Sequence, residues 1–197
     1  MRQFHEDSLV IASHNKDKIG EIKKLLAPYV GNLVTANEKN LPEPEENGAS
    51  FHDNARIKAL AAVAGTNLPA LADDSGICLT ALNGAPGIHS ARWRGESKSY
   101  QTAVDRIFVE LDGRSPAAAE FVTVFALAWP DGEIIYAEGR AQGTLLPKPN
   151  GEDGFGYDAY FIPDGYTQTF SELGAAVKDN ISARARALQA LVKICFQ

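Results

Sequence analysis

The sequence predicts an α/β fold built around a mixed sheet. Short apolar runs alternate with segments of helical periodicity along the 197 residues, and this alternation is typical of α/β proteins. Two β-rich runs, 120–129 and 133–139, are separated by Pro130-Asp131-Gly132, which is a hairpin signal. A hairpin within such a chain indicates a mixed sheet rather than a purely parallel one. At this length, one domain with two lobes is the simplest organisation.

The first third of the chain carries two predicted helices. A short strand, 8–12, leads through a polar loop into a helix whose apolar residues share one face, namely Ile19, Ile22, Leu25 and Leu26. The acidic loop 42–48 precedes a second helix, which Ser50 or Asp53 can cap and Gly65 can end. Residues 70–72 then form a short buried strand.

The remaining elements follow the same alternation. A third helix is predicted from about 99 to 111, with Gly113 after its end. A glycine-rich loop, 151–158, leads into a strand at 160–162, and a last helix covers about 182–195. The sequence contains no internal repeat and no low-complexity segment.

Composition excludes several functional classes. Hydrophobic residues make up 45% of the chain and charged residues 22%, as in ordinary globular proteins. No apolar run has membrane-spanning length and the amino terminus lacks a signal-peptide segment, so we expect a cytoplasmic protein. The two cysteines have no zinc-binding or disulfide pattern. A net charge of −6 disfavours a general nucleic-acid surface but leaves room for a small anionic ligand.

Two adjacent acids stand where the strand 70–72 ends. The run Asp73-Asp74-Ser75-Gly76 fits either a polar turn or a Mg²⁺-assisted phosphate site, because carboxylates are the hard oxygen ligands that Mg²⁺ prefers. If strand geometry persists here, the two acids point to opposite faces and cannot do the same work. Strand geometry leaves open which of them acts as a base; if it is Asp74, Asp73 would support it or bind metal.

Other polar clusters are spread along the chain in a fixed order. Cationic, acidic and aromatic groups alternate, which is the inventory that a nucleoside triphosphate with Mg²⁺ requires. The clusters are Ser13/Asn15/Lys18, Glu45/Glu46, Asn54/Lys58, Asp73/Asp74/Ser75, Phe155 to Asp158, and Lys178/Ser182/Arg184. Each cluster alone is compatible with a solvated loop or helix face, so the indication comes from their combination.

Together these motifs make the sequence resemble the inosine triphosphate pyrophosphatase family, which cleaves nonstandard purine nucleoside triphosphates to the monophosphate and pyrophosphate. The resemblance covers nearly the whole chain. It is carried by residues 13–21, 46–55, 71–76, 84–92, 154–158 and 178–184. It implies a single catalytic domain over residues 1–197, with an elongated twisted central sheet, flanking helices in two lobes and an active-site cleft between the lobes.

The resemblance also implies a role for individual residues. Glu46 and Asp74 would bind Mg²⁺, and Asp74 would also be the general base. The triphosphate would be bound by Ser13, His14, Asn15, Lys18 and Lys58. The nucleoside would be contacted by Ser75, Phe155, Gly156, Tyr157, Asp158, Lys178 and Arg184. The substrates implied are ITP, dITP and XTP, and the assembly implied is a homodimer.

Two positions depart from the family pattern. Ala183 stands where the family usually has a base-contacting histidine, and Ala159 where it usually has proline. Loss of a neutral hydrogen bond costs about 1 kcal/mol, so we expect weaker base discrimination with hydrolysis retained. Two alternatives are a regulatory module that binds the nucleotide without cleaving it and a pyrophosphatase for modified pyrimidine triphosphates.

Overall fold

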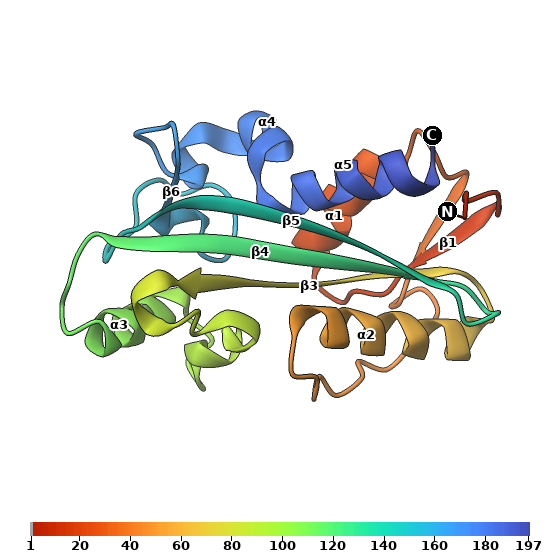
Figure 1. Cartoon of the computed structure of the whole chain (residues 1–197), viewed down its shortest axis with the longest axis horizontal. Helices are drawn as coiled ribbons and strands as arrows, with labels where there is room; N and C mark the ends of the chain where they lie inside the picture. The colour runs from red at the N-terminus through yellow and green to blue at the C-terminus, as the bar shows by residue number, and fades with distance from the viewer. Residues whose placement is uncertain (1) are drawn as a thin grey trace. The chain divides into compact units, whose positions relative to one another are not determined.

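The computed structural model describes residues 2–197 and contains one mixed sheet flanked by helices (Figure 1). The strand order is β2-β1-β3-β4-β5-β6. The strands span Ser8–Ile11 (β1), Asn32–Thr35 (β2), Ala70–Leu79 (β3), Ala117–Ala128 (β4), Ile134–Leu145 (β5) and Phe161–Pro163 (β6). β1 pairs in parallel with β2 and β3, whereas β6 is antiparallel to β5. The predicted α/β fold with a mixed sheet is confirmed.

Capping residues determine where the helices begin. The α-helices of the described chain are Lys16–Leu26 (α1), Phe51–Thr66 (α2), Tyr100–Glu110 (α3), Phe170–Ile181 (α4) and Ala183–Cys195 (α5). Side-chain oxygens of Asn15, Ser50, Ser99 and Thr169 accept hydrogen bonds from the first-turn N–H groups of α1 to α4 respectively. These bonds satisfy donors that a helix start otherwise leaves unpaired.

The chain forms two compact units. Unit 1 comprises the residues up to Asp74 together with Thr123–Gly139 and Arg186–Gln197, and unit 2 comprises Ser75–Val122 and Arg140–Ala185. The chain passes from unit 1 into unit 2 between Asp74 and Ser75. The cleft expected between two lobes stays a prediction.

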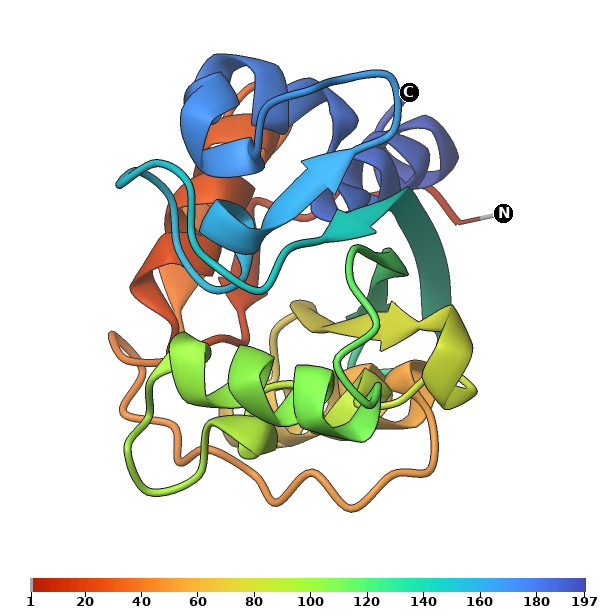
Figure 2. The same ribbon diagram turned by 90° about the vertical axis from the view of Figure 1, so that its left-hand side faces the viewer.

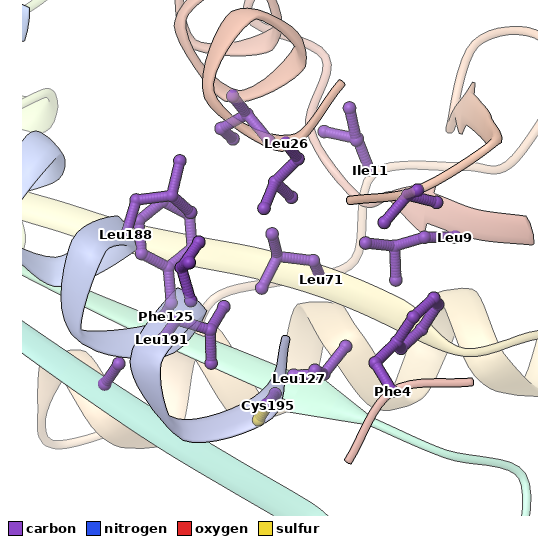
Figure 3. Packing of buried hydrophobic residues seen from close by; sticks show 14 of the residues in the cluster. Phe4, Leu9, Ile11, Leu26, Leu71, Phe125, Leu127, Leu188, Leu191 and Cys195 are labelled. Carbon is purple, nitrogen blue, oxygen red and sulfur yellow. The ribbon is translucent and has the colours of Figure 1, made fainter. Parts of the chain in front are cut away.

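Unit 1 has its own apolar core. α1 and α5 lie on one face of its strands and α2 lies on the other (Figure 1). Figure 3 shows side chains from β1, α1, β3, β4 and α5 meeting in one cluster, among them Ile11, Leu26, Leu71, Leu127 and Leu191. All of them are buried. Burial of each such side chain stabilises the fold by about 1.5–3 kcal/mol relative to leaving it in water. This cluster therefore fixes the positions of β1 and β3, the strands that precede the polar loop and carry the two acids.

Unit 2 is organised around a second core. α3, green in Figure 2, supplies Val104 and Ile107, which pack with Ile77 and Leu79 of β3. Aromatic rings close the other side of this core: Phe161 of β6 stacks on Phe170 of α4 with ring centroids 5.5 Å apart, and Phe121 of β4 contacts Phe161 edge-on at 4.6 Å.

Some predicted boundaries differ from the structure. The strand expected at 70–72 continues through the acidic run to Leu79, so the interpretation of that run as a turn is wrong. α2 does not end at Gly65 but at Thr66, where Asn67 adopts the left-handed conformation that ends a helix. Gly65 instead faces Leu41, because a Cβ there would lie 2.6 Å from a Leu41 methyl carbon. β2 and α4 were not predicted.

Candidate active site

The two adjacent acids lie inside β3 and point to opposite sides of it. Asp73 forms an ion pair with Lys18 at 2.8 Å, and its side chain is 1% exposed. Asp74 instead accepts a hydrogen bond from Asn54 at 3.1 Å and lies 3.7 Å from the ammonium of Lys58. Because successive strand residues alternate in direction, one acid contacts α1 and the next contacts α2. The expectation that the two acids point to opposite faces is confirmed by these contacts, and their different roles stay a prediction.

Lys18 belongs to a polar loop that opens α1. Asn15 caps the helix, its Oδ1 accepting from the backbone N–H groups of Asp17 at 2.9 Å and Lys18 at 3.2 Å. Ser13 Oγ accepts from the N–H of Asn15 at 3.3 Å. Backbone N–H groups and the positive end of the helix dipole make such a helix start a favourable place for an anion. The loop therefore brings the positive end of α1 and the ammonium of Lys18 into one region, and phosphate binding there stays a prediction.

His14 connects this loop to the acidic loop that follows β2. Its Nε2 lies 2.9 Å from the carbonyl oxygen of Leu41, so we assign the ring proton to that nitrogen. One face of the Leu41 side chain lies against Gly65 of α2. The contact anchors the start of the segment that leads to Glu46.

Glu46 and Asp74 converge on one ammonium group. Glu46 Oε1 is 2.6 Å from Nζ of Lys58, and Asp74 Oδ1 is 3.7 Å from the same nitrogen. Lys58 comes one helical turn after Asn54 in α2, so both project toward β3 from the same helix face. Within residues 2–197, no group of three or more His, Cys, Asp or Glu side chains is arranged to hold a metal. A cation here would have two protein carboxylates.

This environment changes the acidity of both partners. Burial raises the pKa of Asp74 above its ordinary value, and the negative charge of Glu46 adds to the rise while Lys58 opposes it. Burial disfavours the charged form of Lys58, but the carboxylates of Asp73, Asp74 and Glu46 outweigh that effect and raise its pKa. Asp74 is thus a stronger base than an ordinary aspartate, and Lys58 stays positively charged.

In unit 2, the glycine-rich loop holds an aromatic ring beside two cations. The ammonium of Lys178, in α4, is 4.2 Å from the centroid of the Phe155 ring, and the guanidinium of Arg184 is 5.7 Å from it. Asp158 is buried, and its Oδ2 accepts from Lys178 Nζ at 2.6 Å and from the Phe155 N–H at 2.9 Å. Gly154 has φ of 85°, and a Cβ there would lie 2.6 Å from that oxygen, so only glycine fits.

Tyr157 has a different environment from Phe155. The residue is 4% exposed, its hydroxyl donates to the carbonyl of Ser90 at 2.8 Å, and the Tyr100 ring contacts its ring edge-on at 4.9 Å. Burial raises its pKa. Tyr157 and Asp158 thus support the loop from within unit 2, whereas the ring of Phe155 is partly exposed.

The last predicted site residues lie at the start of α5. Arg184 donates from Nη2 to Oγ of Ser75 at 3.3 Å. The preceding residue, Ala183, is buried in the core of unit 2. At position 183, where the family usually has histidine, the alanine side chain therefore packs among apolar neighbours.

Comparison with known proteins identifies the family. A family model described as the Ham1 family matches residues 9–194. The dITP/XTP pyrophosphatase of Rhodospirillum centenum is 51% identical over 198 residues, which cover 99% of this chain and 98% of that protein. The chain belongs to the Ham1 family. The resemblance seen in the six motifs is thereby confirmed.

Solved Ham1 structures share the whole fold. A HAM1 protein from Coxiella burnetii superposes with a TM-score of 0.87 at 34% identity, covering 96% of this chain and 98% of that one. The Ham1 protein of Staphylococcus aureus gives 0.84, also at 34% identity, covering 95% and 97%. No helix in residues 2–197 of this Ham1 chain is long and apolar enough to cross a membrane.

Two residues of this Ham1 site make contacts that the sequence did not predict. Asn54 was recognised as a polar neighbour of Lys58 but not as the hydrogen-bond donor to Asp74. Ser90 was part of a motif, yet its hydroxyl proves to accept from the N–H of Ile77 at 2.9 Å and its carbonyl from Tyr157. The i, i+4 spacing of Asn54 and Lys58 is the sequence signal that could have indicated the first contact.

Proposed function

We propose that this Ham1 family protein hydrolyses nonstandard purine nucleoside triphosphates, namely ITP, dITP and XTP, to the nucleoside monophosphate and pyrophosphate. The observation that carries the proposal is the pair of acids in β3, each facing a lysine from a different helix. Curated relatives from Rhodospirillum centenum and Gluconobacter oxydans, the latter 46% identical over 100% of this chain and 95% of that protein, are named dITP/XTP pyrophosphatase.

The triphosphate is bound by the start of α1 and by two lysines. Ser13, His14 and Asn15 form the loop at that helix start, where backbone N–H groups attract phosphate oxygens. Lys18 and Lys58 neutralise the negative oxygens that otherwise repel an attacking nucleophile. The ion pair with Asp73 holds the ammonium of Lys18 in position.

Mg²⁺ fits the donor set beside Lys58. Glu46 and Asp74 offer only oxygen ligands, and both already approach the same cationic nitrogen. Mg²⁺ in phosphate-processing sites is commonly held by one or two carboxylates, with water and substrate phosphates completing its shell. Glu46 and Asp74 would hold the ion, and when bound it would supply neutralisation of phosphate charge and orientation of water.

Asp74 acts as the general base. Its carboxylate takes a proton from the water that attacks the α-phosphorus, and the bond from that phosphorus to the bridging oxygen breaks to release pyrophosphate. The raised pKa of Asp74 makes proton acceptance more favourable than for an ordinary aspartate.

Base selection comes from unit 2. Lys178 and Arg184 are hydrogen-bond donors only, so they favour a 6-oxo purine, which presents an acceptor, over adenine, which presents donors. Phe155 offers the aromatic face for stacking. Gly156 and Ser75 complete the expected contacts, and Tyr157 with Asp158 fixes the shape of the loop.

A panel of triphosphates tests the proposal. ITP, dITP, XTP, GTP, ATP and modified pyrimidine triphosphates are incubated with the protein and Mg²⁺, and pyrophosphate and orthophosphate are measured separately. We expect pyrophosphate from ITP, dITP and XTP. Orthophosphate as the sole product would contradict the proposed cleavage, and binding without monophosphate formation would favour a regulatory module.

Three broader expectations belong to the same proposal. Both units act as one catalytic domain, since the family model spans 9–194. The substrates are free nucleotides, so we place the activity in the cytoplasm. The homodimer implied by the family resemblance is testable by light scattering of the purified chain; Val109 of α3, 77% exposed, is available for such a contact.

A further inference from the structure

Asn54 is a buried amide of α2 that forms a hydrogen bond at each end of its side chain. Its Nδ2 donates to Oδ2 of Asp74 at 3.1 Å. Its Oδ1 accepts from the backbone N–H of Gly48 at 2.9 Å. The residue is 1% exposed, so both bonds are shielded from water. One side chain thus connects the acid in β3 with the loop that carries Glu46.

The two oxygens of Asp74 face different groups. Oδ2 receives the Asn54 bond, while Oδ1 lies on the side of Lys58, 3.7 Å from its ammonium. A carboxylate can rotate about its terminal torsion with little preference, so directional partners determine how it is oriented. The amide of Asn54 supplies such a direction from within a helix, which is a rigid support.

Gly48 brings its loop close to the start of α2. A Cβ at this position would lie 2.7 Å from Oδ1 of Asn54 and 2.5 Å from Cβ of Asp53. The absence of a side chain is therefore what allows the N–H of Gly48 to reach the amide. Since Glu46 is only two residues away, the same contact limits where Glu46 can be.

We propose that Asn54 is a positioning residue that fixes the rotation of the Asp74 carboxylate and, through Gly48, the place of Glu46 relative to it. The inference rests on the proposed function, in which Asp74 is the base and Glu46 and Asp74 hold the metal. Groups that orient metal ligands and catalytic carboxylates from behind commonly matter about 10–100-fold for activity or metal affinity.

The kinetic arm compares Asn54→Ala with Asn54→Asp, using ITP and saturating Mg²⁺. Alanine removes both hydrogen bonds, whereas aspartate keeps the shape and an acceptor for Gly48 but has no amide donor for Asp74. We expect kcat to fall about 10-fold or more in both variants, with KM for ITP changed less than about threefold, because Lys18 and the α1 loop remain.

In an Asp74→Asn background, Asn54→Ala should lower kcat little further, since the two residues act through one group.

The metal arm has a readout independent of catalysis. Mn²⁺ binding to the nucleotide-free protein is measured by electron paramagnetic resonance for wild type and for Asn54→Ala. We expect the dissociation constant to rise about 10-fold, because Glu46 loses its fixed place. Failure of the wild type to bind Mn²⁺ would overturn the inference, since no metal-binding loop would then need positioning.

A glycine pair keeps the test valid if Asn54→Ala does not fold. Gly48→Ala crowds the Asn54 amide without altering it, while Gly20→Ala, in α1, meets no atom within 4 Å. We expect Gly48→Ala to reproduce the fall in kcat and Gly20→Ala to behave as wild type.

The outcomes separate this inference from the proposed function. Wild-type kcat in Asn54→Ala, Asn54→Asp or Gly48→Ala would overturn the positioning role while leaving the activity in place. If the wild-type protein cleaves no triphosphate, the proposed function fails, and the Mn²⁺ measurements still decide whether Asn54 orders the two carboxylates.

Discussion

At the scale of single residues, the two adjacent acids of β3 have different partners. Asp73 belongs with Lys18, and Asp74 with Asn54 and Lys58. Glu46 lies closer to the ammonium of Lys58 than Asp74 does. Neighbouring residues of one strand therefore have different surroundings, and burial raises the pKa of Asp74.

Replacing Asp74 by asparagine should separate activity from stability. We expect Asp74→Asn to lower turnover of ITP by roughly 10²-fold or more, as for loss of a positioned base. The variant keeps an acceptor for Asn54, and in metal-free buffer at pH 7 it should melt at a higher temperature than wild type. Turnover near the wild-type rate would move the role of base to another acid.

The pH dependence of that stability difference has a definite sign. The folded-state pKa of Asp74 lies above its unfolded value of 3.8, so the protonated form is favoured on folding. The stability that this protonation contributes is fully present below the unfolded pKa and is lost as the pH rises through the folded pKa. The stability gap between Asp74→Asn and wild type should therefore be largest near neutral pH and vanish in acid. Thermal melts between pH 3.5 and 8 measure it.

Asp73 should affect substrate binding more than turnover. Asp73→Asn removes a buried charge partner of Lys18, and such charge-assisted hydrogen bonds contribute about 1.5–3 kcal/mol. We expect KM for ITP to rise about 10-fold or more, with a smaller change in kcat. The surface ion pair of Glu120 with Arg140 supplies the matched control: Glu120→Gln should leave both constants and the melting temperature close to wild type.

At the scale of elements, the close approach of β3 to the turn after it is a further constraint. A Cβ at Gly76 would collide with the carbonyl oxygen of Gly87 and lie 2.7 Å from Oγ of Ser90. Overpacking of this kind costs about 1–3 kcal/mol, so Gly76→Ala should lower the free energy of unfolding by that amount in urea titrations. Gly20→Ala should not. Equal stability of the two variants would show that the turn can move away.

The elements predicted from the sequence are those in which local pattern and tertiary packing agree. α1 and α3 have one apolar face each, and the hairpin of β4 and β5 has its turn residues. α4 was not predicted because Gly174, within this helix, has φ of 75° and interrupts the helical period. β3 was predicted too short because Asp73 and Asp74 are poor strand residues, and only lysines from distant helices make them acceptable there.

The candidate site, too, could be predicted only as far as local sequence patterns reach. Side-chain types and their order along the chain indicated the polar loop before α1, the acids of β3 and the glycine-rich loop. They could not indicate that Tyr157 is held by Ser90 or that Asn54 spans from Gly48 to Asp74. Such contacts depend on how loops return to the sheet, which no local pattern records.

At the scale of the whole molecule, ligand binding should be visible as stability. A ligand that binds only the native state at 100 times its dissociation constant adds about 2.7 kcal/mol. We expect a non-hydrolysable ITP analogue with Mg²⁺ to raise the melting temperature, and EDTA to remove most of the gain. Glu46→Gln should show a smaller Mg²⁺-dependent rise, and an equal rise would mean that Glu46 is not a metal ligand.

The alignment of β3 with β1 has a consequence for which sequence changes this protein can tolerate. Ile11 lies opposite Leu71 in the ladder, and this register decides which acid faces α1 and which faces α2. A shift by a single residue reverses the direction of every side chain in a strand. Deleting one residue between Leu71 and Asp73 would therefore present Asp74 to Lys18 and Ser75 to Lys58. The protein would keep both acids in its composition but lose the proposed base, so we expect a change of length to be tolerated far better in a loop than in this strand.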